Sequence, residues 1–289
     1  MDLAVSIKEL NKVFNNKKVL NDLSLDIEHN KIYGLAGRNG AGKTTLLKII
    51  ACHYIKTSGT VEVFGEEPFE NEKILSQICF VGDGNNFMSN MNSKEIFHIA
   101  KIFYPNWDED FKEQLIEKFN LDVSKNYGDL SKGMKSMVNI IIGLASRAPL
   151  TMFDEPYSGL DPVGREIFYR ALLEDYDRYP RCIIFSTHYL EEVSRLFENI
   201  IIIHKGRLLL CDDVDALKEK AFYIRGQKEK LEGIEEKFNV LNKKSHGEIG
   251  TLEVFQPLSE EDKEILEEMG FQIETMPIQK LFVSLTIKD

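Results

Sequence analysis

The chain has 289 residues, which is enough for one sizeable core and a smaller one, so two structural units are expected. Its 36 Lys and Arg stand against 47 Asp and Glu, a formal net charge of −11 that argues against broad binding to nucleic acid or to anionic lipid. The longest apolar runs fall far short of the roughly 18 residues of a spanning helix, and no signal peptide is predicted. Membrane association is therefore expected to go through a protein partner.

The amino-terminal part of the chain predicts strands around one helix. Residues 3–36 alternate like antiparallel strands and end in the apolar segment 31–36. Residues 45–51 have the apolar spacing of a helix, and residues 60–64 and 78–82 read as short strands.

A full match to the phosphate-binding pattern G-x-x-x-x-G-K-[ST] lies between the predicted strand and the predicted helix. Backbone N–H groups of such a loop turn towards phosphates at a helix N-terminus, whose dipole favours negative charge. Lys43 adds a charge at the β- and γ-phosphates, and the Thr44 hydroxyl a magnesium ligand. The alternative, a chance glycine-rich turn, does not explain the order strand, loop, helix. The predicted nucleotide contacts are Gly37, Arg38, Asn39, Gly40, Ala41, Gly42, Lys43, Thr44 and Thr45.

The middle of the chain predicts a helical insertion at about residues 84–148, with helices over 93–103, 108–119 and 132–147. From Leu150 the pattern returns to alternating strands and helices, which indicates a parallel sheet with right-handed crossovers. Residues 200–211 read as a hairpin that closes this α/β core.

The character of the sequence changes near residue 215. The segments 221–225, 240–244, 251–255 and 271–275 read as strands, and 229–238 and 260–269 as helices. This order, βαββαβ, is the split pattern of a ferredoxin-like α+β unit. We therefore predict two domains, residues 1–215 and 216–289.

Two adjacent carboxylates, Asp154 and Glu155, end an apolar strand that begins at Leu150. In a nucleotide hydrolase the first carboxylate of such a pair binds the magnesium shell, and the next polarises a water near the γ-phosphate. Taken alone, the pair is equally consistent with an ordinary boundary between strand and loop.

Three further segments, together with the phosphate-binding pattern and the Asp154–Glu155 pair, make the chain resemble the ATP-binding subunits of ABC transporters. Residues 130–134, Leu-Ser-Lys-Gly-Met, are similar to the family signature Leu-Ser-Gly-Gly-Gln, residues 158–161 resemble its D-loop, and His188 its switch histidine. The resemblance covers residues 3–215 in the family's motif order. It implies a P-loop NTPase cassette with a RecA-like core, an antiparallel β subdomain and a helical insertion, which binds ATP and Mg²⁺.

The resemblance also implies roles for single residues. Glu155 would be the general base, His188 would hold the γ-phosphate, and Phe14 would stack on adenine. Ser131 and Gly133 would face ATP bound to a second ATPase subunit in a head-to-tail dimer. Three alternatives remain open: Phe14 as an ordinary core residue, His188 as a satisfied histidine near a strand end, and Ser131 with Gly133 as a helix cap only. A cap and a phosphate contact are compatible.

Three positions depart from the family pattern. Lys132 and Met134 replace a glycine and a glutamine of the signature, whereas Ser131 and Gly133 are kept. After the strand 78–82 the family has a glutamine near magnesium, and this chain has Asp83. Since Mg²⁺ prefers oxygen ligands, Asp83 could join Thr44 and Asp154 as a metal ligand, or it could only form a turn.

The expected function is that of an ATP hydrolase, the subunit of an ABC transporter that works with an integral membrane permease and a second, identical or different, ATPase subunit. The expected location is the cytoplasmic face of the plasma membrane, with no nucleic acid partner. Because residues 278–286 resemble the ending of drug, peptide and lipid exporters, export is expected. A soluble ABC-type ATPase and a nucleotide-gated regulator are the alternatives. Phe87, Met88 and Met91 are expected to dock the permease, or else to pack the insertion.

Overall fold

A six-stranded sheet forms the centre of the computed structural model, which describes residues 3–82, 87–188 and 190–287. The strand order is β5-β6-β7-β3-β8-β9, and only β9 runs antiparallel to its neighbour. Because β3, β6 and β7 are parallel neighbours and fully buried, their carboxyl ends meet at one edge of the sheet, where α/β folds bind ligands. The strands are β3 (Ile32–Ala36), β5 (Ile78–Gly82), β6 (Leu150–Asp154), β7 (Cys182–Thr187), β8 (Asn199–His204) and β9 (Arg207–Asp213).

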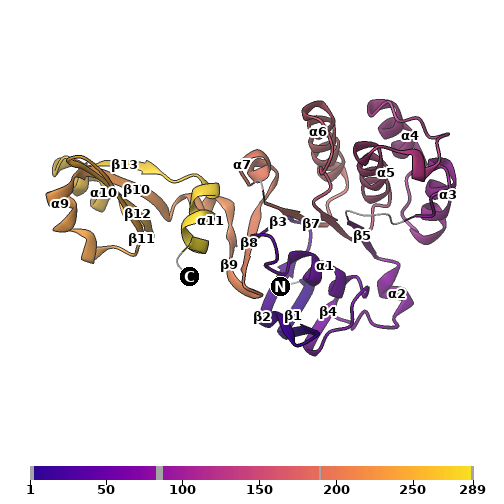
Figure 1. Cartoon of the computed structure of the whole chain (residues 1–289), viewed down its shortest axis with the longest axis horizontal. Helices are drawn as coiled ribbons and strands as arrows, with labels where there is room; N and C mark the ends of the chain where they lie inside the picture. Colours follow the sequence, from indigo (N-terminus) through magenta and orange to yellow (C-terminus); the bar gives the residue numbers. More distant parts are fainter. Residues whose placement is uncertain (1–2, 83–86, 189, 288–289) are drawn as a thin grey trace.

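A second sheet of three antiparallel strands, in the order β2-β1-β4, lies below the first in Figure 1. Its strands are β1 (Leu3–Phe14), β2 (Lys17–Glu28) and β4 (Ser58–Val63). Helix α1 (Lys43–Ile50) packs in the same buried cluster as both sheets, through residues such as Leu46 and Leu47. This packing holds the amino-terminal end of α1 at the edge of the central sheet.

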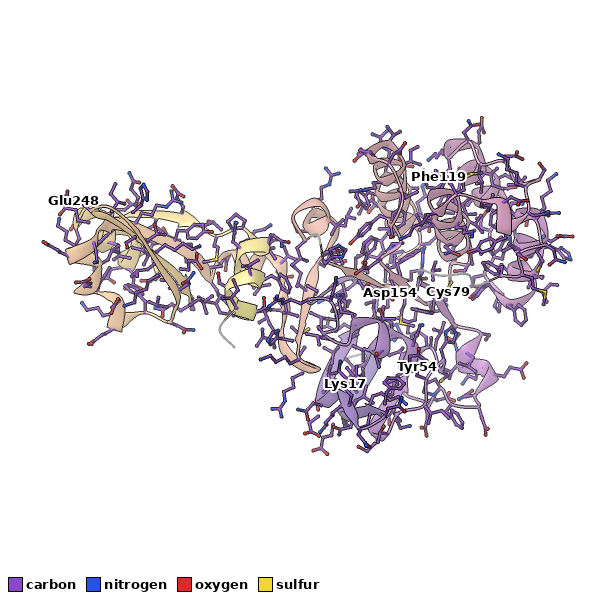
Figure 2. The ribbon with its side chains drawn as sticks, in the orientation of Figure 1. Lys17, Tyr54, Cys79, Phe119, Asp154 and Glu248 are labelled. Carbon is purple, nitrogen blue, oxygen red and sulfur yellow. The ribbon has the colours of Figure 1, made fainter. Side chains whose placement is uncertain are left out.

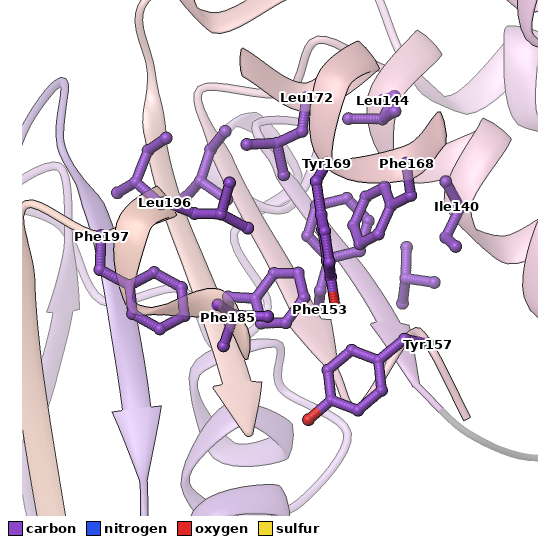
Figure 3. Packing of buried hydrophobic residues seen from close by; sticks show 14 of the residues in the cluster. Ile140, Leu144, Phe153, Tyr157, Phe168, Tyr169, Leu172, Phe185, Leu196 and Phe197 are labelled. Carbon is purple, nitrogen blue, oxygen red and sulfur yellow. The ribbon is translucent and has the colours of Figure 1, made fainter. Parts of the chain in front are cut away.

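Helices α5 (Lys132–Ala145), α6 (Pro162–Arg178) and α7 (Leu190–Val193) pack in the cluster that covers the other face of the central sheet. Figure 3 shows the centre of this cluster, where Phe153 of β6, Phe168 of α6 and Phe185 of β7 lie beside one another. Their ring centroids are 5.5 to 6.1 Å apart. The aromatic packing fixes the end of β6 relative to the end of β7.

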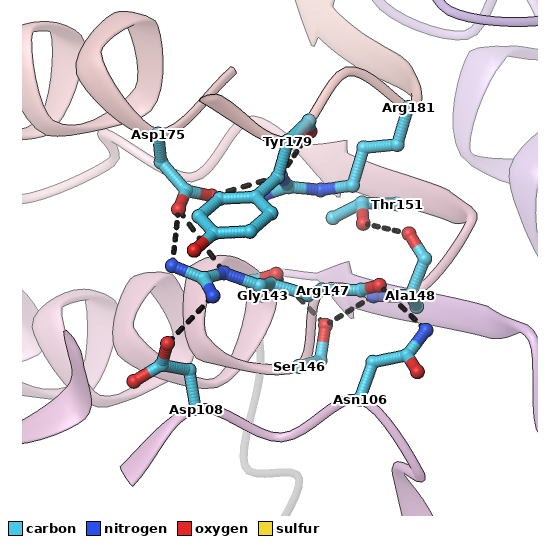
Figure 4. A network of polar contacts seen from close by, with 10 residues as sticks. All are labelled: Asn106, Asp108, Gly143, Ser146, Arg147, Ala148, Thr151, Asp175, Tyr179 and Arg181. Atoms are coloured by element: carbon cyan, nitrogen blue, oxygen red, sulfur yellow. Dashed lines mark hydrogen bonds and ion pairs between the residues drawn. The ribbon is translucent and has the colours of Figure 1, made fainter. Parts of the chain in front are cut away.

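The insertion contains α3 (Ser93–Phe103), α4 (Glu109–Lys118) and α5, while the short α2 (Glu72–Leu75) precedes β5. Arg147, after α5, joins this insertion to the core through the network in Figure 4. Its guanidinium binds Asp108 at 2.6 Å and Asp175 of α6 at 3.0 Å, and Asp175 also binds Arg181 at 2.8 Å. The Asp175 and Arg181 side chains are 2% and 4% exposed, so water does not compete for this ion pair.

The carboxy-terminal region contains a four-stranded antiparallel sheet in the order β11-β12-β10-β13. Its small core includes Ile224, Leu252, Leu266 and Phe271. The predicted helix over 229–238 is wrong at its end, because α9 stops at Glu232 and a 3-10 turn follows over 235–237. The elements are α8 (Val214–Lys218), β10 (Ala221–Gln227), α9 (Lys228–Glu232), β11 (Val240–His246), β12 (Ile249–Phe255), α10 (Glu260–Glu268), β13 (Gln272–Thr275) and α11 (Ile278–Ile287).

Helix α11, which the sequence analysis did not predict as a helix, lies between the carboxy-terminal sheet and the central sheet (Figure 1). Ile278, Leu281 and Phe282 belong to the same buried cluster as Leu196 and Phe197 of the core. Removal of everything after residue 213 would therefore expose apolar core surface. Across the described ranges, no helix has both the length and the apolar character needed to cross a bilayer.

Candidate active site

The predicted phosphate loop connects β3 to α1, as the sequence pattern requires. Gly42 is the N-cap of α1 with φ of 111°, and Gly40 has φ of 81°, two left-handed conformations that a glycine adopts without strain. A Cβ on Gly40 would meet no atom within 4 Å, so the loop is open on that side, whereas a Cβ on Gly42 would meet Leu20 at 2.7 Å. The loop therefore packs against β2 at Gly42 and is open at Gly40, where a ligand could approach the backbone.

Lys43 and Thr44, the last two residues of the pattern, face the acidic end of β6. The Lys43 ammonium donates to the carbonyl of Gly37 at 2.7 Å, and the side chain is almost completely buried. Burial lowers the pKa of Lys43, while Glu155 and Asp154 act in the opposite direction. Thr44 Oγ1 donates to Asp154 Oδ2 at 2.6 Å. A hydroxyl and a carboxylate at this separation suit Mg²⁺, which usually binds through one or two carboxylates, phosphates and waters.

The turn between β8 and β9 supports the loop from behind, a contact that the sequence analysis missed. The Gly206 N–H donates to the carbonyl of Ala41 at 3.0 Å, and the Gly206 carbonyl accepts from the Asn21 N–H at 2.9 Å. Gly206 has φ of 77°, and a Cβ there would lie 2.2 Å from the carbonyl oxygen of Val19. Only glycine fits this approach, so a glycine at the turn of a predicted hairpin was the available signal.

The second carboxylate, Glu155, lies beside His188. Its Oε1 is 3.0 Å from His188 Nδ1, and the two side chains are 29% and 33% exposed. Both are thus accessible to a ligand held by the loop. Figure 2 labels Asp154, the last residue of β6, near the middle of the molecule. Glu155 follows it directly in the chain.

The end of β7 holds this acidic segment from the side. The buried Ser186 hydroxyl bonds to Asp154 Oδ1 at 2.5 Å, so that both Asp154 oxygens have hydroxyl partners. Thr187 Oγ1 lies 2.5 Å from the hydroxyl of Tyr157. The sequence motifs identify His188 but give no role to Ser186 or Thr187.

The signature residues lie against the Ser158–Asp161 segment of the same chain. Ser131 is the N-cap of α5 and accepts from the Met134 N–H at 3.2 Å, as the cap reading predicts. A Cβ on Gly133 would approach the carbonyl oxygen of Gly159 to 2.5 Å, and Ser136 donates to the Ser158 carbonyl at 2.6 Å. The signature and the D-loop segment are therefore in direct contact within one chain. A contact of Ser131 with ATP stays a prediction.

Phe14 lies at the carboxyl end of β1. Its ring forms an edge-on pair with Tyr54 at 5.3 Å between centroids, and the Lys12 ammonium lies 4.4 Å from its centroid. The ring is half-buried and thus neither a full core residue nor free in solvent. Stacking on adenine stays a prediction. Asp83 falls outside the described residues, so its predicted place near the metal is likewise untested.

A cavity of about 430 Å³ extends from the metal end of the site to the insertion. Thr44, Gly82 and Asp154 line it from the core, and Phe87, Ile99, Phe103 and Tyr104 line it from the insertion. The Asn139 amide donates to the Gly82 carbonyl at 3.3 Å across the same space. Residues that would hold magnesium and apolar residues of the insertion thus share one cavity.

Comparison with known proteins agrees with these features. The sequence pattern of the family described as "ABC transporter" matches residues 20–158. The ABC transporter ATP-binding protein YtrB of Bacillus subtilis is 30% identical over 223 residues, 77% of this chain and 76% of YtrB. The chain belongs to the ABC transporter ATP-binding proteins. It is an ATP hydrolase with the mixed α/β fold of this family.

Further relatives extend the comparison along the chain and to solved structures. The bacitracin transport ATP-binding protein BcrA of Bacillus licheniformis is 29% identical over 91% of this ATPase and 88% of BcrA, which reaches beyond residues 1–215. A solved ATP-binding subunit of an ABC transporter has 25% identity and a TM-score of 0.67, and covers 74% of the ATPase and 92% of that chain. A dimeric cassette bound to ADP and Pi, at 19% identity and a TM-score of 0.63, shares the fold.

Proposed function

We propose that this ATPase powers export of a small molecule, a peptide or a lipid through a separate integral membrane permease, at the cytoplasmic face of the plasma membrane. One observation carries the proposal: the cavity that begins at Thr44 and Asp154 is lined at its other end by apolar residues of the insertion. A partner that pressed on those residues would be coupled directly to the nucleotide site.

The proposed docking surface is named here the α3 patch and consists of Met88, Ile99, Ile102 and Phe103. Their exposed fractions are 71%, 39%, 70% and 66%, which are high values for large apolar side chains. Phe87 and Met91, two residues predicted to dock a partner, are instead half-buried against the core cluster, and Phe87 packs edge-on against Tyr127. We therefore assign them a packing role and place docking on the α3 patch.

For the chemistry, we propose that Thr44 and Asp154, joined by Asp83, hold Mg²⁺ and that the backbone of the phosphate loop and Lys43 hold the phosphates of ATP. Bound magnesium would neutralise phosphate charge. Glu155 takes the proton of a water whose oxygen forms a bond to the γ-phosphorus while the bond to the ADP oxygen breaks. His188, bonded to Glu155 at 3.0 Å, orients the carboxylate and donates to the γ-phosphate.

A second ATPase subunit is proposed to complete each site through Ser131 and Gly133, placed at the amino-terminal end of α5. Helix N-termini favour phosphate. The contact between Ser136 and Ser158 would transmit a change at one signature helix to the D-loop segment of the same subunit. ATP would thus hold two subunits together until hydrolysis separates them.

We further propose that residues 216–289 form an accessory domain, with a ferredoxin-like core, that regulates the ATPase through α11. Gln279 Oε1 accepts the Leu190 N–H at 3.0 Å, and Leu190 opens α7 two residues after His188. At the other side of α11, the Ser284 hydroxyl donates to the buried carboxylate of Glu253 in β12. Helix α11 thereby contacts both the carboxy-terminal sheet and the segment that carries His188.

The decisive experiment is purification of the tagged ATPase from membranes of its source in mild detergent. We expect an integral membrane protein to co-purify in fixed ratio and to be lost when Ile102 is replaced by Glu. Recovery of the wild-type protein from the soluble fraction alone would contradict a transport role and favour a free ABC-type ATPase.

A further inference from the structure

Ser186 occupies the point where β7 ends beside the catalytic segment. It pairs in register with Asp154 of the parallel strand β6, and its side chain is completely buried. A buried hydroxyl needs hydrogen-bond partners, and those of Ser186 are on the two carboxylate residues of the site.

The single hydroxyl of Ser186 serves two functions at once. It donates to Asp154 Oδ1 at 2.5 Å, and it accepts the backbone N–H of Glu155 at 3.0 Å. A serine hydroxyl can do both because it has one proton and two lone pairs. Asp154 is thereby held in the orientation that presents Oδ2 to Thr44 Oγ1.

The backbone of Glu155 is in a conformation that needs such support. Its φ is 49°, in the left-handed region that residues other than glycine occupy sparsely and that is kept only where the surroundings enforce it. The accepted N–H belongs to this same residue. Two residues later, the Tyr157 hydroxyl is 2.5 Å from Thr187 Oγ1, and its ring stacks on Phe185 at 5.7 Å between centroids (Figure 3).

We propose that Ser186 is a positioning residue for ATP hydrolysis, which holds Glu155 in its left-handed backbone conformation and fixes the orientation of Asp154. The inference rests on the proposed role of Glu155 as the general base. The left-handed turn directs the Glu155 side chain away from the strand direction and to the side of His188. Without the Ser186 hydroxyl, the Glu155 N–H loses its acceptor, and the turn loses one of the bonds that hold it.

The test compares Ser186→Ala with Ser186→Thr, which keeps the hydroxyl, and with Ile184→Val, a small truncation of a buried residue in the same strand. For Ser186→Ala we expect kcat to fall about 10- to 100-fold, the scale of a misplacement of about 1 Å, with the KM for ATP changed by less than about threefold. Ser186→Thr should regain most of the rate, and Ile184→Val should keep it. If Ser186→Ala does not fold, Ser186→Cys, with a weaker hydrogen-bonding group, takes its place.

A second measurement does not depend on turnover. In the nucleotide-free protein, amide hydrogen exchange of the Glu155 N–H should accelerate at least tenfold in Ser186→Ala and not in Ile184→Val, because only the first variant removes the acceptor. Unchanged exchange together with unchanged kcat would refute the positioning role.

The double variant Ser186→Ala with Glu155→Gln separates this inference from the proposed function. If Ser186 acts through Glu155, it should hydrolyse ATP no more slowly than Glu155→Gln alone. An additional tenfold loss would refute action through Glu155 alone and would leave Asp154 as the residue through which Ser186 acts. If Glu155→Gln by itself retained the wild-type rate, the proposed role of Glu155 would fail first.

Discussion

Glu155 Oε1 lies 3.0 Å from His188 Nδ1, so the proposed general base and the proposed γ-phosphate donor are in direct contact. Replacement of Glu155 by Gln removes the base and a negative charge near the phosphates but leaves a side chain of the same size. We expect hydrolysis to fall by about 10²- to 10⁴-fold while ATP binding persists. Size-exclusion chromatography with ATP and Mg²⁺ should then show a stable dimer.

The matched control for this variant is Glu62→Gln, on the exposed side of β4. It should hydrolyse ATP as the wild type does and form no trapped dimer. A Glu155→Gln protein that stayed monomeric at saturating ATP and kept the wild-type rate would contradict the assignment.

Asp83→Asn tests whether the departure from the family glutamine matters for the metal. Asn keeps the capacity to form a turn but removes the negative charge. If Asp83 joins Thr44 and Asp154 at the metal, the Mg²⁺ concentration for half-maximal hydrolysis should rise several-fold, since a charged ligand is lost. Magnesium titrations of Asp83→Asn and of Asp110→Asn, an exposed control on α4, decide the question. Identical magnesium titration curves for the two variants would show that Asp83 only forms a turn.

Ile102→Glu, in the α3 patch, should separate assembly from chemistry. Ile102 is 70% exposed, so a charge there costs the isolated subunit little stability, yet it would be desolvated against an apolar partner. We expect unchanged hydrolysis by the isolated ATPase and loss of co-purification with the permease. Val163→Glu, at a 67% exposed site on α6, is the control that should still assemble. If both variants co-purify equally with the permease, the α3 patch is not part of the interface with the permease.

Gln279→Ala removes the acceptor of the Leu190 N–H at the start of α7. Loss of a cap typically costs about 1 kcal/mol, which is about fivefold in an equilibrium, so we expect about a fivefold lower kcat with nucleotide affinity retained. Gln279→Glu keeps an acceptor oxygen and should restore the rate, whereas Lys280→Ala, one residue along, should have no effect. Equal rates for Gln279→Ala and wild type would leave α11 as a packing element only.

Asp175→Ala tests the network that joins the insertion to the core. It would leave Arg181 buried without its carboxylate partner and would free one side of Arg147. Removal of one member of a buried ion pair costs about 3 to 5 kcal/mol. Urea unfolding should show this loss of unfolding free energy, with less than about 0.5 kcal/mol for Asp177→Ala, an exposed neighbour on α6. A loss below about 1 kcal/mol for Asp175→Ala would contradict a structural role for the pair.

The sequence alone predicted those parts of this ATPase that local chemistry dictates. The glycine spacing before Lys43 and Thr44 requires a phosphate loop wherever a strand precedes it and a helix follows it. The apolar run that ends at Asp154 and Glu155 predicts a buried strand with two acids at its end. These features depend on neighbours in the chain, and the structure places them together at the carboxyl ends of β3 and β6.

Only the tertiary structure decided which distant residues support the site. Ser186 contacts Glu155 across 31 positions, Gly206 contacts Ala41 across the fold, and Gln279 reaches Leu190 across 89 positions. The sequence analysis did not identify helix α11, although Ile278, Leu281, Phe282 and Leu285 have the apolar spacing of a helix. Only the structure shows that this helix packs against both the core and the carboxy-terminal region. Such contacts arise from the packing of whole sheets. The local sequence can mark one member, as the hairpin glycine Gly206 does, but it does not identify the distant partner.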